Sequence, residues 1–315
     1  IGQEACTMVT VPFALYDAFS DTAFGGSQAG VVSDAAWLDA NARRRIAREV
    51  GAPATGFVTA CGDHSISARF LSTVTELPMC GHGTIGLMTR MVELGDVIWD
   101  GGDKIELELC LPTATAAVEI SRRNDGRPLV MLDVRPPLFR QDMLDAEELA
   151  GLLGLRMEDY RQEWPVETAS GDFVHLVVPV KDLEAMRRIS PDFGGLTRFC
   201  HEHGLQTVAV FCTEVERPDH TLHVRDFCPA VGVSESAAAG TTSGALTSYL
   251  IRNGFVGENG DGRIVVQAEQ GHEIERPSSI RSVVSMEGDT IARLQVGGVA
   301  TKVVDGQLHL PLARQ

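Results

Sequence analysis

A thiol and an imidazole lie two residues apart in the stretch TELPMCGHGTIGLMTRMVELG, residues 75–95, where Cys80 and His82 are each followed by a glycine. An apolar, strand-like run ends here and a helical pattern begins, so Gly81 and Gly83 would open a helix whose first N–H groups are unpaired. Those donors, together with the helix dipole, bind a carboxylate without a lysine.

The same field lowers the pKa of a nearby thiol, and a value of about 7 or 8 would make Cys80 a general base. His82 would then donate to the substrate or tune the thiol. The plain alternative is that Cys80 is a small buried residue and His82 an ordinary turn histidine.

A second stretch, AGTTSGALTSYLIRNG (239–254), aligns without gaps with CGHGTIGLMTRMVELG (80–95). Gly81 meets Gly240 and Leu87 meets Leu246, and both stretches follow a strand-like segment and end near a glycine. We therefore expect two similar halves. Because Ala239 stands where the first turn has Cys80, a thiol in each turn is not expected.

The two turns supply the predicted carboxylate contacts. In the first turn these are backbone and hydroxyl groups of Gly81, Gly83 and Thr84, and in the second they are those of Gly240, Thr241 and Thr242.

Segments of alternating hydrophobicity are interleaved with shorter helical patterns, which predicts an α+β fold. Predicted helices cover residues 34–51, 83–95, 145–155, 194–204 and 241–254. The polar, turn-rich segment SRRNDGRP (121–128) is the best boundary, giving domains 1–125 and 126–315. This division allows the last strand of the chain to cross back and join the first half.

Composition excludes several classes of function. A formal net charge of −16 argues against nucleic-acid and anionic-membrane partners, and no uncharged apolar run is long enough for a membrane helix. The seven cysteines are scattered and never spaced as CxxC, which favours a reducing, cytoplasmic setting over a disulfide framework or a zinc site. We predict no metal.

Several motifs together resemble one known family. ELPMCGHGTIG is similar to the ELPxCGHxT motif of the PhzF-like isomerases, relatives of diaminopimelate epimerase and proline racemase. VRDFCPAVGVSESAAAGTTSGAL is similar to their RxFxPxxGVxEDPATGSAxGAL, and VVQAEQGHEIERPSSI to their QGxxMGRPSxI. Motif order and spacing hold along nearly the whole chain.

The resemblance implies two pseudo-symmetric halves, each a sheet wrapped around a central helix, with the active site between them. It also implies a homodimer, a small carboxylate substrate and no cofactor. The chemistry it implies is removal of a proton next to a carboxylate and its return.

The sequence departs from the family pattern at both acid/base carboxylates. The glutamate of the phenazine-type isomerases falls on Ala54, and the aspartate of their EDPATGS turn falls on Ser236. Glu235 is therefore a candidate substitute acid, while Ser236 and Gln28, the latter in a GNPA-like turn, are candidate substrate contacts.

A single base on one face suits migration of a double bond, because the same group can remove and return the proton. We predict a cofactor-independent isomerase of a small, cyclic unsaturated amino or imino carboxylate in specialised metabolism, such as antibiotic biosynthesis. Two alternatives stay open. One is a hydroxyproline-type dehydratase or epimerase that uses Cys80 as its single base, and the other is a family member that binds a ligand without catalysis.

Overall fold

The computed structural model describes residues 8–99, 102–142, 144–257 and 262–311, which form two compact units. Unit 1 takes in residues 1–24, 28–130 and 299–315, and unit 2 takes in residues 25–27 and 131–298. The chain thus passes from one unit to the other at residue 130, five residues after the expected boundary at 125, and the segment from Val299 onward is part of unit 1.

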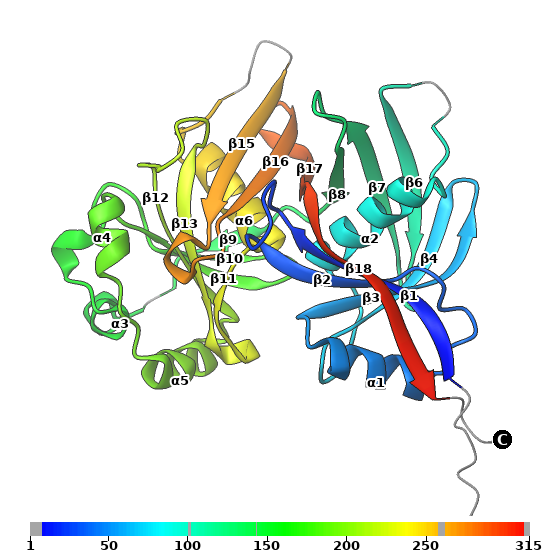
Figure 1. Ribbon diagram of the computed structural model, residues 1–315. Helices are drawn as coiled ribbons and strands as arrows, with labels where there is room; N and C mark the ends of the chain where they lie inside the picture. Colours follow the sequence, from blue (N-terminus) through cyan, green and yellow to red (C-terminus); the bar gives the residue numbers. More distant parts are fainter. Residues whose placement is uncertain (1–7, 100–101, 143, 258–261, 312–315) are drawn as a thin grey trace, which may run out of the picture. The chain divides into compact units, whose positions relative to one another are not determined.

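Unit 1 is a mixed sheet with two helices, coloured from blue through cyan to green in Figure 1 except for its last strand, which is red. Its helices are α1 (Ala40–Val50) and α2 (Gly81–Leu94). Its strands are β1 (Met8–Ala18), β2 (Ser27–Val32), β3 (Ala54–Gly62), β4 (Ser65–Leu71), β5 (Glu76–Leu77), β6 (Lys104–Cys110), β7 (Thr115–Arg122) and β18 (Ala300–Pro311). The last of these pairs antiparallel with β1.

Unit 2 follows β8 (Pro128–Asp133), along which the chain leaves unit 1. Its strands are β9 (Leu138–Arg140), β10 (Glu167–Ser170), β11 (Val174–Pro179), β12 (Thr207–Cys212), β13 (Leu222–Cys228), β14 (Val233–Ser236), β15 (Arg263–Gln270), β16 (Ser278–Glu287) and β17 (Thr290–Gly298). Its helices are α3 (Ala146–Leu153), α4 (Leu183–Arg188), α5 (Phe193–His203) and α6 (Gly240–Arg252), with short 3-10 turns at Met157–Asp159, Pro229–Val231 and His272–Ile274.

The two units repeat one strand-pairing pattern. In unit 1, β2 runs parallel to β3, β3 antiparallel to β4, β4 parallel to β6 and β6 antiparallel to β7. In unit 2, β11, β12, β13, β15 and β16 follow the same sequence of pairings. A short strand precedes one helix of each unit: the two-residue β5 comes before α2, and the four-residue β14 comes before α6. The α+β fold of two pseudo-symmetric halves is confirmed.

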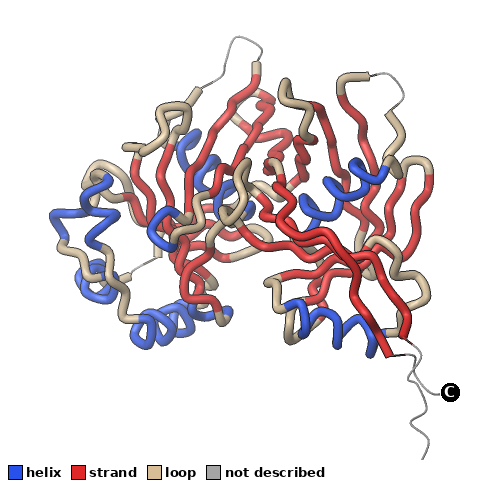
Figure 2. Tube along the Cα trace, in the orientation of Figure 1, coloured by secondary structure: helices blue, strands red, loops and turns tan. Residues whose placement is uncertain are grey.

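Each unit encloses one helix. Nine consecutive residues of α2, Gly83 to Met91, are buried, as are nine of α6, Thr242 to Leu250. These two blocks coincide in the gap-free alignment of residues 80–95 with 239–254. A helix that is buried around its whole circumference has no solvent-facing side, so α2 and α6 are the central helices of their units. Figure 2 shows both in blue among red strands.

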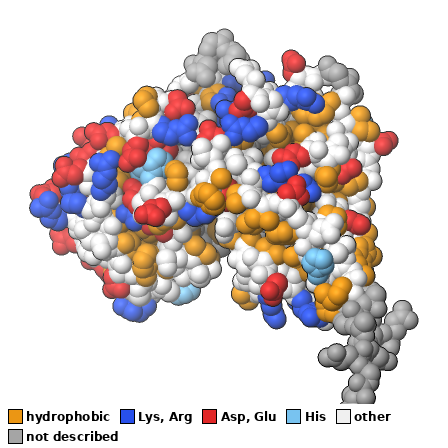
Figure 3. Space-filling view, viewed as in Figure 1, with side chains coloured by type: hydrophobic (Ala, Val, Ile, Leu, Met, Phe, Trp, Pro, Cys, Tyr) orange, Lys and Arg blue, Asp and Glu red, His pale blue; other side chains and the backbone are white. Residues whose placement is uncertain are grey.

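The remaining helices pack on the outside of their sheets. In unit 2, α3, α4 and α5 pack on β11 and β12 through an apolar cluster that includes Leu149, Met186 and Phe199. The sequence predicted α3 and α5 but missed α4, which has only six residues. Figure 3 shows the charged outer surface over α3 and α4. No helix in the described parts of the chain combines the length and hydropathy needed to cross a membrane.

Close packing of α2 predicts a large effect of a single methyl group. A Cβ on Gly86 would lie 2.8 Å from the Cβ of Ala29 and 3.4 Å from that of Tyr16. We expect Gly86→Ala to lower the free energy of unfolding by about 1–3 kcal/mol, because β1 and β2 would have to move.

The matched control is Gly151→Ala on α3, where an added Cβ meets nothing within 4 Å. It should leave the protein unchanged or stabilise it by roughly 0.5–1 kcal/mol. Urea unfolding followed by circular dichroism measures both, and equal effects of the two substitutions would contradict the close packing of α2.

Candidate functional site

The two central helices begin differently from the outer ones. In each of α1, α3, α4 and α5 an aspartate side chain accepts hydrogen bonds from first-turn N–H groups; these are Asp39, Asp145, Asp182 and Asp192. The residues at the same position of α2 and α6 are Cys80 and Ala239, and neither makes a side-chain capping bond. Apart from the Gly83 N–H, which acts on the Cys80 thiol, the first-turn donors of α2 and α6 are therefore left for another acceptor.

The first turn of α2 has room on one side only. A Cβ on Gly81 would meet nothing within 4 Å, whereas one on Gly83 would lie 2.9 Å from the ring of Phe70 and 3.1 Å from Cys80 Sγ. The Thr84 hydroxyl donates to the Cys80 carbonyl at 2.8 Å. Gly81 thus faces open space, while Gly83 and Thr84 hold the turn in shape.

Cys80 and His82 are brought together, but not as an ion pair. Cys80 Sγ lies 3.6 Å from His82 Nδ1 and 3.5 Å from Nε2. The lone-pair and N–H directions of the two ring nitrogens diverge, so a sulfur equidistant from both cannot lie along either one. The contact is a close approach without a well-directed hydrogen bond.

Burial keeps both groups neutral. Burial raises the pKa of the Cys80 thiol to about 12 and outweighs the N–H of Gly83, which lowers it. His82 is partly exposed but densely surrounded, and desolvation lowers its pKa to about 4. The expected thiol pKa near 7 or 8 is therefore wrong: the helix end does act on Cys80, but loss of hydration is the larger effect.

The first turn of α6 is held by Gln270. Its Nε2 donates to the Ser236 carbonyl at 2.7 Å, and its Oε1 accepts from the Ala239 N–H at 3.3 Å. One side-chain amide therefore joins the end of β14 to the residue before α6, and it fixes the direction of the turn that carries Gly240 and Thr241. Ser236 enters this arrangement through its backbone.

Glu235 has a structural role in this geometry. Its carboxylate accepts from Arg225 Nε at 2.9 Å and from Nη2 at 2.8 Å, and both side chains are less than a tenth exposed. Arg225 also donates to the carbonyls of Met186 and Ile189. A carboxylate held in a two-point ion pair is poorly suited to carry a proton.

The remaining positions named from the sequence lie in unit 1. Gln28 is half-buried in β2, and Ala54, which replaces a glutamate of the family pattern, is fully buried at the start of β3.

A cluster beneath the first turn of α6 escaped the sequence reasoning. Thr242 Oγ1 donates to Asp226 Oδ2 at 2.9 Å, and the Cys228 thiol donates to the same oxygen at 3.4 Å. His175 Nδ1 lies 2.7 Å from Thr207 Oγ1 and 3.4 Å from Thr242 Oγ1. Burial raises the pKa of Asp226 to about 6 and lowers that of His175 to about 4.

One signal for this cluster was present in the sequence. Asp226 and His175 are polar residues inside the apolar strands HTLHVRDF and FVHLVVPV, and buried polar groups of that kind need partners.

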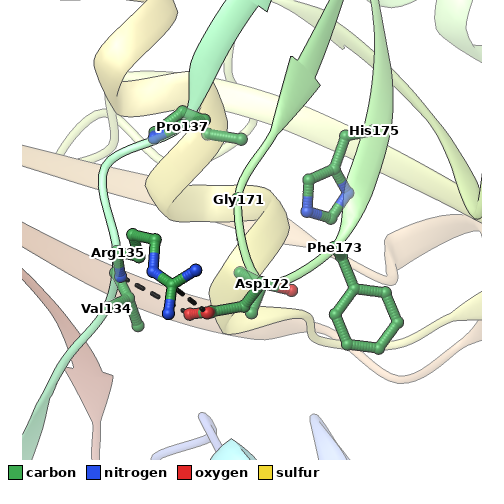
Figure 4. Close-up of a pocket in the computed structure, with 9 residues that line it drawn as sticks. Val134, Arg135, Pro137, Gly171, Asp172, Phe173 and His175 are labelled. Atoms are coloured by element: carbon green, nitrogen blue, oxygen red, sulfur yellow. Dashed lines mark hydrogen bonds and ion pairs between the residues drawn. The ribbon is translucent and has the colours of Figure 1, made fainter.

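A small pocket opens beside this cluster in unit 2 (Figure 4). Its lining includes Thr241 and Ala245 of α6, His175 of β11 and the neighbouring Phe173. Figure 4 shows Arg135 paired with Asp172 on one side and the imidazole of His175 beside the ring of Phe173 on the other. His175 thus connects the pocket with the buried hydroxyl groups around Asp226.

Within the described residues, no group of three or more His, Cys, Asp or Glu side chains is arranged to hold a metal ion.

Comparison with known proteins gives a consistent result. The family model for phenazine biosynthesis-like proteins matches residues 16–306. An uncharacterised isomerase of Mesorhizobium japonicum is 29% identical over 310 residues, covering 96% of this chain and all of the relative. The trans-2,3-dihydro-3-hydroxyanthranilate isomerase of Pseudomonas chlororaphis is 29% identical over 289 residues, covering 91% of this chain and 95% of the relative.

A solved structure extends the likeness to three dimensions. The crystal structure of the Bacillus anthracis phenazine biosynthesis protein of the PhzF family superposes with a TM-score of 0.86 at 25% sequence identity, covering 95% of this chain and 99% of that one. The resemblance deduced from the motifs is confirmed.

The charge state of the thiol can be tested directly. We expect no thiolate absorbance from Cys80 at 240 nm up to pH 9 in the difference between wild type and Cys80→Ser, because burial places its pKa at about 12. The control is the same absorbance difference between wild type and Cys110→Ser, which removes a half-buried thiol. A Cys80 thiolate signal at pH 7.5 would show that an ion pair with His82 forms after all.

The Arg225–Glu235 pair predicts a stability effect. Glu235→Gln leaves the buried guanidinium without its counter-charge, so we expect the free energy of unfolding to fall by about 3 kcal/mol. Glu184→Gln, which removes the exposed partner of Arg188, should have no measurable effect. Urea unfolding distinguishes the two, and a full loss of activity without a loss of stability in Glu235→Gln would instead indicate proton transfer.

Proposed function

Because the chain belongs to the family of phenazine biosynthesis-like proteins and is an isomerase, we propose that it moves a proton, and with it a double bond, on a small cyclic unsaturated amino or imino carboxylate. The observation that carries this proposal is the pair of uncapped first turns on α2 and α6, in a chain whose other α-helices are capped by aspartate among the described residues. Free first-turn N–H groups bind carboxylates well.

The state of Cys80 and His82 supports an assignment of roles. A neutral imidazole accepts a proton, and a neutral thiol supplies one, so the pair can act on two carbons of a conjugated system in the same encounter. The C–H proton passes to a nitrogen of His82 while the S–H proton passes to the carbon at the far end of the shifting double bond.

The pair then returns to its starting state without solvent. The imidazolium formed on His82 and the thiolate formed on Cys80 are within 3.6 Å, so once the ring turns one N–H toward the sulfur, one proton transfer between them regenerates two neutral groups. No group remains charged in a site whose burial disfavours charge. This scheme replaces the expectation that Cys80 alone is the base.

Further parts of the proposal concern the molecule's setting. We propose a homodimer that acts in specialised metabolism, with the first turns of α2 and α6 as the carboxylate contacts. The Pseudomonas relative is named for dihydrohydroxyanthranilate, a ring carboxylate that bears an amino group. Compounds of this class are the first substrates to examine.

The test is turnover in D2O over a panel that contains trans-2,3-dihydro-3-hydroxyanthranilate and cyclic imino acids such as the pyrroline carboxylates. We expect a shifted double bond and up to one deuterium at the carbon that receives the proton, read by NMR and mass spectrometry. Cys80→Ser and His82→Gln should each lower turnover by at least about a hundredfold.

Cys110→Ser is the matched control, because it removes a half-buried thiol elsewhere in unit 1, and it should leave turnover unchanged. A product that has lost water would indicate a dehydratase, and an inverted centre would indicate an epimerase. Full activity in His82→Gln would refute the assigned base.

A further inference from the structure

Asp226 is exceptional among the buried carboxylates of unit 2. Glu167 is paired with Arg252, Asp159 with Arg188 and Glu235 with Arg225. Glu269 accepts from the imidazole of His223 and from the backbone N–H groups of Glu216 and Arg217.

Asp226 is 1% exposed, and within the described residues no arginine, lysine or backbone N–H donates to it. Its Oδ1 is buried without any partner. A buried carboxylate that lacks a cation keeps its proton to a higher pH than an exposed one.

Asp226 also lies at the turn to which the substrate carboxylate is assigned. Thr242, whose hydroxyl donates to Asp226, is the third residue of α6, and its own N–H is one of the uncapped donors. An ionised Asp226 would place negative charge within one helical turn of a bound anion. The two anions would compete for the same positive helix end.

We propose that binding of a carboxylate at the first turn of α6 is linked to protonation of Asp226, which makes Asp226 a positioning residue that admits an anion only when it is neutral. This inference rests on the proposed function, since it concerns the same carboxylate contact. Unit 2 then takes up one proton for each carboxylate bound at that turn.

The surroundings of Asp226 fit this linkage. Thr242 of α6 and Cys228 of β13 donate to it, and His175 of β11 contacts the hydroxyl groups of Thr207 and Thr242. The nearest other charges are Glu235 on β14 and its partner Arg225. The charge of Glu235 helps to raise the pKa of Asp226, which lies at about 6, so the charge of Asp226 changes close to neutral pH.

A route for the proton is also present. His175 lines the pocket of Figure 4, and the hydroxyl of Thr242 contacts both its imidazole and the carboxylate of Asp226. A proton that enters from the pocket can reach Asp226 over this hydroxyl group without a water molecule inside the sheet.

The sign of the pH dependence follows from linkage. Below the pKa of free Asp226, which burial raises to about 6, the carboxyl group is already protonated and the affinity for an anion is constant. Above it, each anion bound must bring a proton, so the affinity falls by up to about tenfold per pH unit. In Asp226→Asn this dependence disappears, and the affinity at pH 8 exceeds that of the wild type.

The experiment is calorimetric titration of the full chain with benzoate, a planar ring carboxylate, at pH 7 in Bis-Tris and in imidazole buffer. The two buffers differ in ionisation enthalpy, so the difference in observed heat gives the protons taken up. Amide NMR shifts of Thr241 and Thr242 report whether benzoate lies at the turn, and uncharged benzamide serves as the ligand control.

We expect uptake of close to one proton per benzoate in the wild type and none in Asp226→Asn. Glu167→Gln, which alters a buried carboxylate paired at the other end of α6, should keep the uptake. Benzoate binding at the turn without uptake in the wild type would overturn the linkage and leave the proposed function standing. Uptake that persists in Asp226→Asn but is lost in His175→Gln would overturn it in favour of the histidine.

Failure of benzoate to shift the turn amides between pH 5 and 8, in the wild type and in Asp226→Asn alike, would overturn both the linkage and the carboxylate contact. Should Asp226→Asn fail to fold, benzoate binding without uptake in the wild type still overturns the linkage, and uptake that is lost in His175→Gln still overturns it in favour of the histidine.

Discussion

Enclosing a helix within a sheet constrains what its N-terminus can do, and the rest of the structure depends on this. A surface helix satisfies its first N–H groups with water or an aspartate cap, and α1, α3, α4 and α5 use the cap. The enclosed helices α2 and α6 have no side-chain cap. Their first residues, Gly81 and Gly240, nevertheless remain partly exposed. Their first turns therefore remain accessible to an acceptor from outside the helix.

Desolvation sets the chemistry at both turns, and with the same sign. Cys80 in unit 1 and Asp226 in unit 2 each lie at the first turn of the enclosed helix, and burial raises the pKa of each. Both turns therefore hold an acid that keeps its proton to a higher pH than a helix dipole alone would allow, Cys80 throughout the neutral range and Asp226 up to about pH 6. A positive helix end with a neutral acid beside it keeps its attraction for an external carboxylate, which an internal anion would cancel.

The sequence predicted what depends on local pattern and missed what depends on packing. The echo of residues 80–95 in 239–254 predicted both enclosed helices, because a glycine-rich turn and an apolar stripe are local features. The thiol pKa was predicted wrongly because the density of packing around Cys80 has no local signature. Asp226 meets Thr242 and His175 only through the pairing of β11, β12 and β13, which a single sequence does not reveal.

Strand register places Asp226 beside Ser236, the position at which the family pattern has an aspartate. Asp226 on β13 and Ser236 on β14 are direct cross-strand partners, so their side chains lie on the same face of the sheet. A carboxylate at position 236 would lie at the partly exposed end of a short strand, where it would be ionised at neutral pH. The same group at position 226 is buried and keeps its proton until the pH exceeds about 6. Moving the acid across one pair of strands thus raises the pH at which the group beside the proposed carboxylate contact becomes an anion.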